Sequence, residues 1–306
     1  MAAVLQKSSS YVFIILLGYA LKRAGVLGRQ DYRVLSQVVL CVTLPAAVVT
    51  NFASMQWDMS LLAIPLVGLL LNCLMLFAGQ LVSRKKDPAA RALFMINCPG
   101  YNIGAFALPF VQSFLGPTAV VAACLFDVGN AIVCTGGSYA YTSALLRVGG
   151  EQPGVKAVLK KLAGSVPFMT YIIMLGLVMA GVRLPGALTQ FISPIAAANP
   201  FVAMFMVGAM FELEPKPEYL RQMGQVLALR LAAAAAAALA LYHFAPFSLE
   251  IRQVLAVMAF APASVISPAF TEKCGGSGPL AGCLNSATIL LGVVGMLGVL
   301  LALGVA

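Results

Sequence analysis

Residues 97–102 read Asn-Cys-Pro-Gly-Tyr-Asn, and they interrupt an apolar segment that is otherwise long enough to cross a membrane. A second apolar segment is interrupted at residues 261–264, which read Ala-Pro-Ala-Ser. The next Gly-Pro pair begins 17 residues after Pro99 in the first case and 16 residues after Pro262 in the second. Paired breaks at matching places in two halves of a membrane chain indicate a transporter's binding site.

The composition is that of a membrane protein. Hydrophobic residues make up 61% of the chain and charged residues 9%, whereas about a quarter of the residues are charged in soluble domains. A helix that crosses the hydrocarbon layer needs about 20 mostly apolar residues. We therefore predict an all-α polytopic membrane protein with ten transmembrane helices, at residues 8–27, 35–54, 61–82, 92–115, 118–146, 162–182, 187–211, 224–245, 252–273 and 280–304.

The placement of cations predicts the orientation. With ten spans, 15 of the 19 Lys and Arg residues fall in loops on one side of the membrane, three fall on the other side, and Arg230 lies inside a span. The positive-inside rule places the 15 in the cytoplasm. Both termini are then expected on the non-cytoplasmic side of the cytoplasmic (inner) membrane. The net charge of +9 is explained by topology and needs no nucleic acid as a partner.

Short matches between the halves predict an internal repeat. Each predicted half, 1–149 and 150–306, holds five spans, and an odd number requires the two halves to insert in opposite orientations. The matched positions are 17–18 with 175–176, 25–26 with 181–182, 44–45 with 199–200, Pro99 with Pro262, and 124–125 with 283–284. Two inverted repeats predict alternating access around a site near the membrane midplane.

The breaks themselves predict the substrate site. Proline removes a backbone N–H and frees the carbonyl one turn earlier, so each break must be buried in protein or face water. If the two broken helices cross, the N-termini of half-helices present N–H donors that suit a carboxylate. The alternative is that the prolines only kink their helices. The residues expected to bind substrate are Asn97, Pro99, Gly100, Asn102, Pro262, Ser264 and Ser267.

Asp127 lies in the middle of the fifth predicted span, three residues before Asn130. A carboxylate at this depth is costly and should face protein or a wet cavity. We interpret the pair as a proton or cation coupling site. The alternative is a structural carboxyl group that holds the fourth and fifth helices together.

Secondary candidates are polar residues inside other spans. Arg230 could neutralise an anionic substrate, but its length favours pairing at the cytoplasmic interface with Glu212 or Glu218. The polar residues Asn285, Ser286 and Thr288 of the tenth span fall at the repeat position of the Asp127 region and could line a cavity or join helices. Asn199 of the seventh span is the remaining secondary candidate.

Enzyme and cofactor motifs are not found. The chain contains no HExxH and no GxSxG, and the glycine-rich run at 274–278 lacks the ending of a phosphate-binding loop. One histidine and seven cysteines without a CxxC pair predict no metal site. We expect no enzymatic activity and no cofactor.

Residues 97–110 resemble the fourth-span signature of the auxin efflux carrier family in its bacterial branch, within the bile-acid/arsenite/auxin transporter superfamily. The resemblance implies crossing broken helices 4 and 9. It also implies a scaffold of helices 1, 2, 6 and 7 and a transport domain of helices 3–5 and 8–10 that moves as an elevator. The family's substrates are organic anions, such as auxin in plants and malate or malonate in some bacterial members.

The predicted function is therefore that of a secondary transporter for a small organic anion. The alternatives are a passive channel, a non-transporting membrane scaffold, or a sodium-coupled symporter like the family's bile-acid cousins. The expected partners are the organic anion and the lipid bilayer. The sequence leaves open the substrate, the direction of transport, proton or sodium coupling, and a homodimer.

Overall fold

The computed structural model describes residues 2–28, 30–55, 58–148, 154–211 and 216–304. Within these ranges the regular structure is helical, and the one pairing of extended backbone is an isolated bridge between Tyr101 and Ala263. The predicted all-α class is therefore confirmed. The expected boundary between the two halves, at residues 149 and 150, lies outside the described ranges.

Several helices are interrupted by short π-helical or 3-10 segments. The first half contains α1 (Ala2–Arg23), α2 (Tyr32–Val38), η1 (Val39–Thr43), α3 (Leu44–Ser54), η2 (Met59–Ala63), α4 (Ile64–Ser83), α5 (Pro88–Asn97), η3 (Ile103–Ala107), α6 (Leu108–Phe114), α7 (Pro117–Ile132), η4 (Val133–Gly137) and α8 (Ser138–Leu146). The second half contains α9 (Val155–Ala163), α10 (Val166–Met179), α11 (Gly186–Met210), η5 (Pro217–Tyr219), α12 (Leu220–Phe244), α13 (Leu249–Met258), α14 (Ser267–Lys273) and α15 (Gly278–Ala302).

Six helical segments of the described chain are long and apolar enough to cross a membrane, and a seventh is added if α9 and α10, which are bent by 77°, form one span. This number is lower than the ten predicted spans. Part of the difference has a simple reason: the predicted spans 92–115 and 252–273 each consist of two short helices separated by a break, so neither contains one long helix. The six segments are 32–54, 59–83, 117–146, 186–210, 217–244 and 278–302.

The two Gly-Pro pairs begin the helices that follow the breaks. Pro117 occupies the first turn of α7 and Pro279 that of α15, where a missing N–H removes no helical hydrogen bond. In α15 the hydroxyl of Ser277 also accepts a bond from the backbone N–H of Leu280, at 3.3 Å. These residues end the connecting turns and start the next span.

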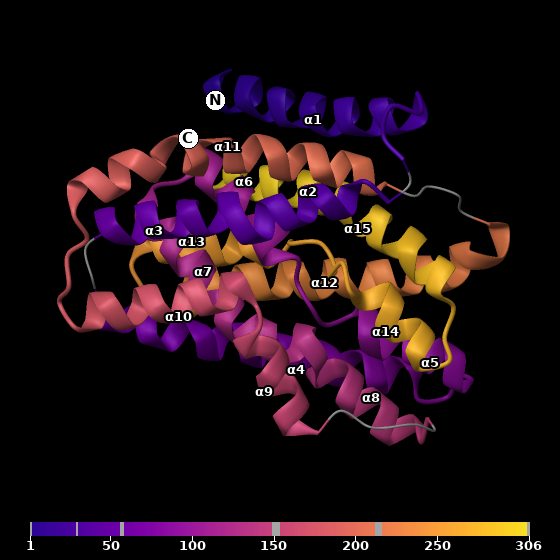
Figure 1. Ribbon diagram of the computed structural model, residues 1–306. Helices are drawn as coiled ribbons and strands as arrows, with labels where there is room; N and C mark the ends of the chain where they lie inside the picture. Colours follow the sequence, from indigo (N-terminus) through magenta and orange to yellow (C-terminus); the bar gives the residue numbers. More distant parts are fainter. Residues whose placement is uncertain (1, 29, 56–57, 149–153, 212–215, 305–306) are drawn as a thin grey trace.

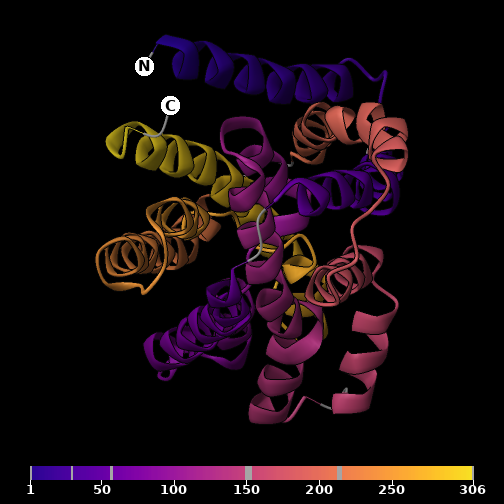
Figure 2. The same cartoon turned by 90° about the vertical axis from the view of Figure 1, so that its left-hand side faces the viewer.

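Glycines allow two helix pairs to approach closely. A Cβ atom at Gly18 of α1 or at Gly208 of α11 would overlap the backbone of the other helix, and the same holds for Gly68 of α4 and Gly129 of α7. Small residues at such contacts let helix backbones touch, which is how helices commonly associate in membranes. Figures 1 and 2 show α1 lying along the edge of the molecule against α11.

Helix α7 lies at the centre of the molecule. Figure 2 shows α4 and α12 on one side of the central helices and α10 and α11 on the other. Most of α7 is buried, from Ala119 to Phe126 and again at Gly129 and Asn130. The polar residues of α7 are therefore held inside the protein, next to the broken helices.

Candidate functional site

The two predicted breaks are present, and they lie against each other. The first separates α5 from η3 and the second separates α13 from α14. Tyr101 and Ala263 form the isolated antiparallel bridge, and the N–H of Asn102 donates to the carbonyl of Pro262 at 2.9 Å. The chain segments freed by the prolines thus satisfy part of their backbone hydrogen bonding with each other.

Gly100 shapes the turn of the first break. Its φ of +81° is in the left-handed region, which glycine adopts without steric cost. A Cβ atom here would also lie 3.1 Å from the Sγ of Cys134 and 3.3 Å from the Cβ of Ser264. Gly100 therefore has a conformational role and a packing role at the crossing.

Two asparagines hold the first break from the side. The Oδ1 of Asn130 accepts from the N–H of Tyr101 at 3.0 Å, and its Nδ2 donates to the carbonyl of the same residue at 2.8 Å. Asn72 of α4 accepts from the N–H of Gly100 at 2.7 Å and donates to Asn130 at 3.2 Å. These amides replace the backbone partners that an unbroken helix would supply.

The second break is held by residues of α15. Asn285 donates to the carbonyls of Ala263 and Ser264, at 3.1 and 2.8 Å. The hydroxyl of Thr288 accepts from the N–H of Ala263 at 3.0 Å. The sequence left two roles open for Asn285 and Thr288, which were to line a cavity or to join helices. The observed hydrogen bonds are of the second kind, because they join α15 to the second break.

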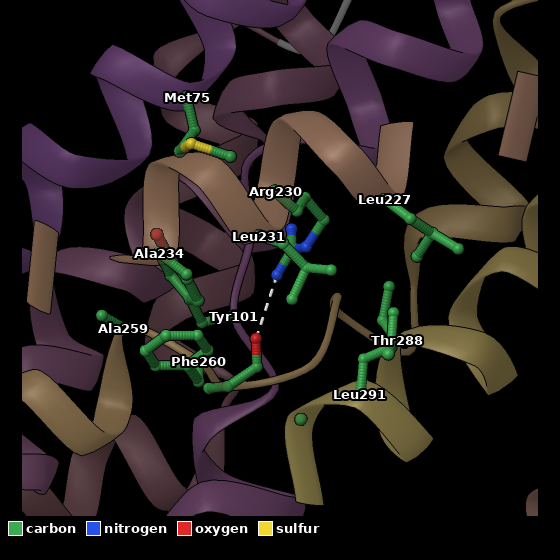
Figure 3. Close-up of a pocket in the computed structure, with 12 residues that line it drawn as sticks. Met75, Tyr101, Leu227, Arg230, Leu231, Ala234, Ala259, Phe260, Thr288 and Leu291 are labelled. Carbon is green, nitrogen blue, oxygen red and sulfur yellow. Dashed lines mark hydrogen bonds between the residues drawn. The ribbon is translucent and has the colours of Figure 1, made fainter. Parts of the chain in front are cut away.

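Arg230 is buried at the crossing, with 8% of its surface exposed. Its guanidinium group donates to the carbonyls of Asn97 (3.0 Å), Cys98 (2.6 Å) and Ala261 (3.0 Å). The expected pairing with Glu218 at the cytoplasmic interface is wrong, because the side chain turns inward to carbonyls that the breaks leave free; Glu212 lies outside the described residues. Figure 3 shows Arg230 beside Tyr101, with a dashed line for the bond to the second break.

A cavity of about 460 Å³ lies next to the crossing. All three π-helical segments of the described chain contribute to its wall, and such segments are frequent at functional sites. The cavity is lined by Ser36, Leu40, Tyr101, Asn102, Ile103, Gly104, Ala105, Asp127, Asn130, Ala131, Cys134, Thr135, Ser165, Pro167, Phe168, Tyr171, Ser264, Val265, Ile266 and Ala269.

Asp127 is the one charged residue among the described residues that line this cavity. Its Oδ1 accepts from the Nδ2 of Asn130 at 2.8 Å, and its Oδ2 accepts from the hydroxyl of Tyr171 at 3.2 Å. Tyr171 belongs to α10, so the carboxyl group connects the fifth predicted span to the sixth. These two hydrogen bonds of Asp127 do not form the alternative, which was a link between the fourth and fifth helices.

Asn102 lines the cavity, and its side chain holds an unpartnered donor that is itself buried. It is 6% exposed, and its Nδ2 atom has no hydrogen-bond partner among the described residues. It immediately precedes the helical segment Ile103–Phe114, whose first N–H groups carry the positive end of the helix dipole. This side of the cavity is therefore suited to a negatively charged group.

The structure brings four of the predicted site residues to the cavity, namely Asn102, Ser264, Asp127 and Asn130. The other predicted side chains lie behind the crossing or away from it. Asn97 donates to Thr271 at 2.8 Å, and Ser267 faces the carbonyl of Ile96 at 3.5 Å. Pro99, Gly100 and Pro262 shape the breaks. Ser286 donates to the carbonyl of Gly282 within α15, and Asn199 bonds to Thr43 and Gln112.

Tyr171 and Asn72 are functional candidates that sequence reasoning missed. Tyr171 carries no motif, and its partner is 44 residues away in the chain. Asn72 did carry a signal, because it is a polar residue in the middle of the predicted span 61–82, and polar residues at that depth normally have a partner.

Comparisons with known proteins show which proteins the chain is similar to. A family model described as membrane transport protein matches residues 5–149. The chain is 27% identical over 130 residues to an uncharacterized transporter of Methanothermobacter thermautotrophicus, which covers 41% of this chain and 43% of the relative. It is 23% identical over 218 residues to an uncharacterized transporter of Methanocaldococcus jannaschii, which covers 67% of each.

The proteins that match are described as membrane transport proteins, and the six apolar helical segments of the described chain that are long enough to cross a membrane are those of a multi-pass membrane protein. The match to this family model agrees with the resemblance to the auxin efflux carrier family seen at residues 97–110. The family model covers the first break, whereas the second break lies beyond the matched residues.

Proposed function

We propose that this protein is a secondary transporter that moves a small organic anion across the cytoplasmic membrane by alternating access. The observation that carries the proposal is the cavity at the crossing, which is lined by Asn102 and by the N-terminus of Ile103–Phe114. A volume of about 460 Å³ suits a small mono- or dicarboxylate.

The predicted orientation places the cavity on the cytoplasmic side of the crossing. Ser36, Ser165 and Ala269 line it, and each lies near a helix end that the charge pattern assigns to the cytoplasm. The described conformation then corresponds to the inward-facing state. The ten-span, inverted-repeat organisation supplies the second, outward-facing state by symmetry.

Asp127 is proposed to couple transport to protons. An anionic substrate and an ionised Asp127 in one small cavity would repel each other, since Coulomb interactions are strong where water is scarce. A proton that binds Asp127 together with the substrate removes this repulsion. Each transport cycle then carries a proton with the anion.

The hydrogen bond between Asp127 and Tyr171 fits an elevator movement. Asp127 lies in the proposed transport domain and Tyr171 in the proposed scaffold, and the bond of 3.2 Å joins them. Movement of the transport domain must break this bond. Its strength would then depend on whether Asp127 is charged, because a hydrogen bond to an ionised acceptor is stronger.

The test is counterflow in proteoliposomes with a panel of radiolabelled mono- and dicarboxylates. The panel is chosen by thermal shift of the purified protein, because a bound ligand stabilises the folded state. Saturable uptake that exchanges with internal substrate is expected. Linear, non-saturating flux would indicate the passive channel, and stabilisation by organic amines alone would reassign the substrate to a cation held by Asp127.

The coupling role has a separate test in the variant Asp127→Asn. This variant is expected to retain exchange of substrate but to lose the response of uptake to a pH gradient. Asp58→Asn is the matched control, because Asp58 is exposed and its hydrogen bonds among the described residues go to the nearby Ser60. An unchanged pH-gradient response in Asp127→Asn refutes proton coupling through this residue.

A further inference from the structure

Arg230 has an environment that the transport proposal does not use. Its Nη1 atom donates to the carbonyls of Asn97 and Cys98, with Gly100 at a longer 3.4 Å, and its Nη2 atom donates to the carbonyl of Ala261. One side chain of α12 therefore binds the backbone of both breaks. Arg230 is not among the residues that line the large cavity.

The described partners of this cation are carbonyl groups and an aromatic face, and none is a carboxylate. The guanidinium carbon lies 5.4 Å from the centre of the Tyr101 ring. A buried cation at this depth needs compensating charge. The remaining source of negative charge is the backbone itself.

The charge balance at the crossing can be worked out from the helix ends. Helix α5 ends at Asn97 and α13 ends at Met258, and each has ten residues. A helix C-terminus carries about half a negative elementary charge. The two ends together supply about one negative charge, which matches the single positive charge of Arg230.

We propose that Arg230 is a tethered cation that occupies, at the crossing, the place of a bound monovalent metal ion. In secondary transporters, unwound carbonyls and the C-terminal ends of half-helices are the groups that coordinate sodium. Here those acceptors are filled by the planar, five-donor guanidinium group, which stays charged at all physiological pH values. The crossing of this protein therefore has no need of sodium, and Arg230 is a positioning residue that fixes both half-helices.

A small cavity beside Arg230 supports this assignment. It is lined by Tyr101 and Ala261 from the two breaks and by Leu227, Arg230 and Thr288, as Figure 3 shows for most of these side chains. Its volume of about 20 Å³ has room for a single water molecule at most. The space that a hydrated ion would need is already filled by the arginine side chain.

The test needs no substrate, so its outcome is independent of the proposed transport function. The melting temperature of the purified protein is measured in NaCl and in choline chloride at equal ionic strength, and no sodium-specific shift is expected. Arg230→Ala is expected to melt at a lower temperature. Its stability should be restored, in a saturable manner, by guanidinium chloride at low millimolar concentration or by sodium, and not by the same concentration of urea.

Arg252→Ala is the matched control. Arg252 also donates to a backbone carbonyl and faces a tyrosine ring, both of them in Tyr242. These contacts join α13 to α12 and lie away from the crossing. Neither guanidinium nor sodium should restore this variant. Rescue of Arg252→Ala to the same extent would show that the effect is non-specific and would overturn the proposal.

Two further variants keep the proposal testable if Arg230→Ala does not fold. Arg230→Lys retains the charge and is expected to fold and to remain insensitive to sodium. Arg230→Met retains length without charge and is expected to be unstable without added cation. A wild-type protein stabilised specifically by sodium, or an Arg230→Met variant as stable as the wild type, would each overturn the assignment.

Discussion

Asn130 offers the strictest test of how the first break is held. Its amide group takes part in four hydrogen bonds with nitrogen or oxygen partners, and two of them serve the N–H and the carbonyl of Tyr101. With 2% of its surface exposed, the side chain is almost fully buried, although it borders the cavity. Asn130→Ala leaves the N–H of Tyr101 without its partner and removes a donor from Asp127, whereas the carbonyl of Tyr101 keeps the N–H of Ile103 at 3.0 Å.

The magnitude follows from the orphaned N–H of Tyr101 and from the hydrogen bond that Asp127 loses. Each buried polar group left unsatisfied costs about 1–3 kcal/mol, although hydrogen bonds inside membranes average about 0.6 kcal/mol because other partners are found. We expect a total loss of about 2–4 kcal/mol. At about 2–4 °C per kcal/mol for a chain of this size class, the melting temperature should fall by roughly 5–10 °C.

The assay is a thermal melt of the purified protein in detergent, with Asn51→Ala as the control. Asn51 donates one hydrogen bond, at 2.7 Å, to a carbonyl of its own helix, so its loss should lower the melting temperature by about 2 °C or less. Equal shifts for the two variants would refute the reasoning, because they would mean that the break does not depend on the Asn130 amide.

Three other substitutions test the packing and the site by the same thermal melt. Gly129→Val should prevent the close approach of α7 to α4 and cost about 1–3 kcal/mol or more, whereas Gly176→Val should have little effect, since a Cβ there meets no atom within 4 Å. Tyr171→Phe removes one donor to Asp127 and should cost about 1 kcal/mol or less; a larger loss would point to a packing role for the hydroxyl. Asn285→Ala removes the donor to two carbonyls of the second break and should cost about 1–3 kcal/mol, and a neutral result would show that the second break is held by its own backbone.

The breaks were predictable because proline and glycine act locally. Proline removes a helical hydrogen bond and crowds the preceding turn wherever it stands, although α11 continues through Pro194 and Pro200. The structure ends α5 two residues before Pro99 and α13 four residues before Pro262, and the Gly-Pro pairs that follow begin new helices. The meeting of the two breaks was also predictable, since orphaned backbone groups in a membrane need protein partners.

The directions of individual side chains were not predictable in this way. Arg230 has a stem long enough to reach either the cytoplasmic interface or the crossing, and the choice depends on carbonyls that are 31 and 132 residues away in the chain. Asn97 was expected to face the substrate, but its amide donates to Thr271, 174 residues further along. Such choices depend on long-range packing, which no local pattern in the sequence encodes.

In the proposed transport function, the helix ends at the crossing would set its selectivity for an anion. Without Arg230, the C-terminal ends of α5 and α13 would place about one negative charge at the crossing, close to the cavity that Tyr101 also lines. An anion in the cavity would then meet repulsion from behind the break as well as from Asp127. Because Arg230 cancels the repulsion from behind the break, the positive N-terminus of Ile103–Phe114 remains as an uncompensated helix end at the cavity. Protonation of Asp127 would then remove the other source of repulsion that an anion meets. A fixed cation on one face of the break and a titratable acid on the other would thus make substrate binding depend on protons while leaving it independent of metal ions.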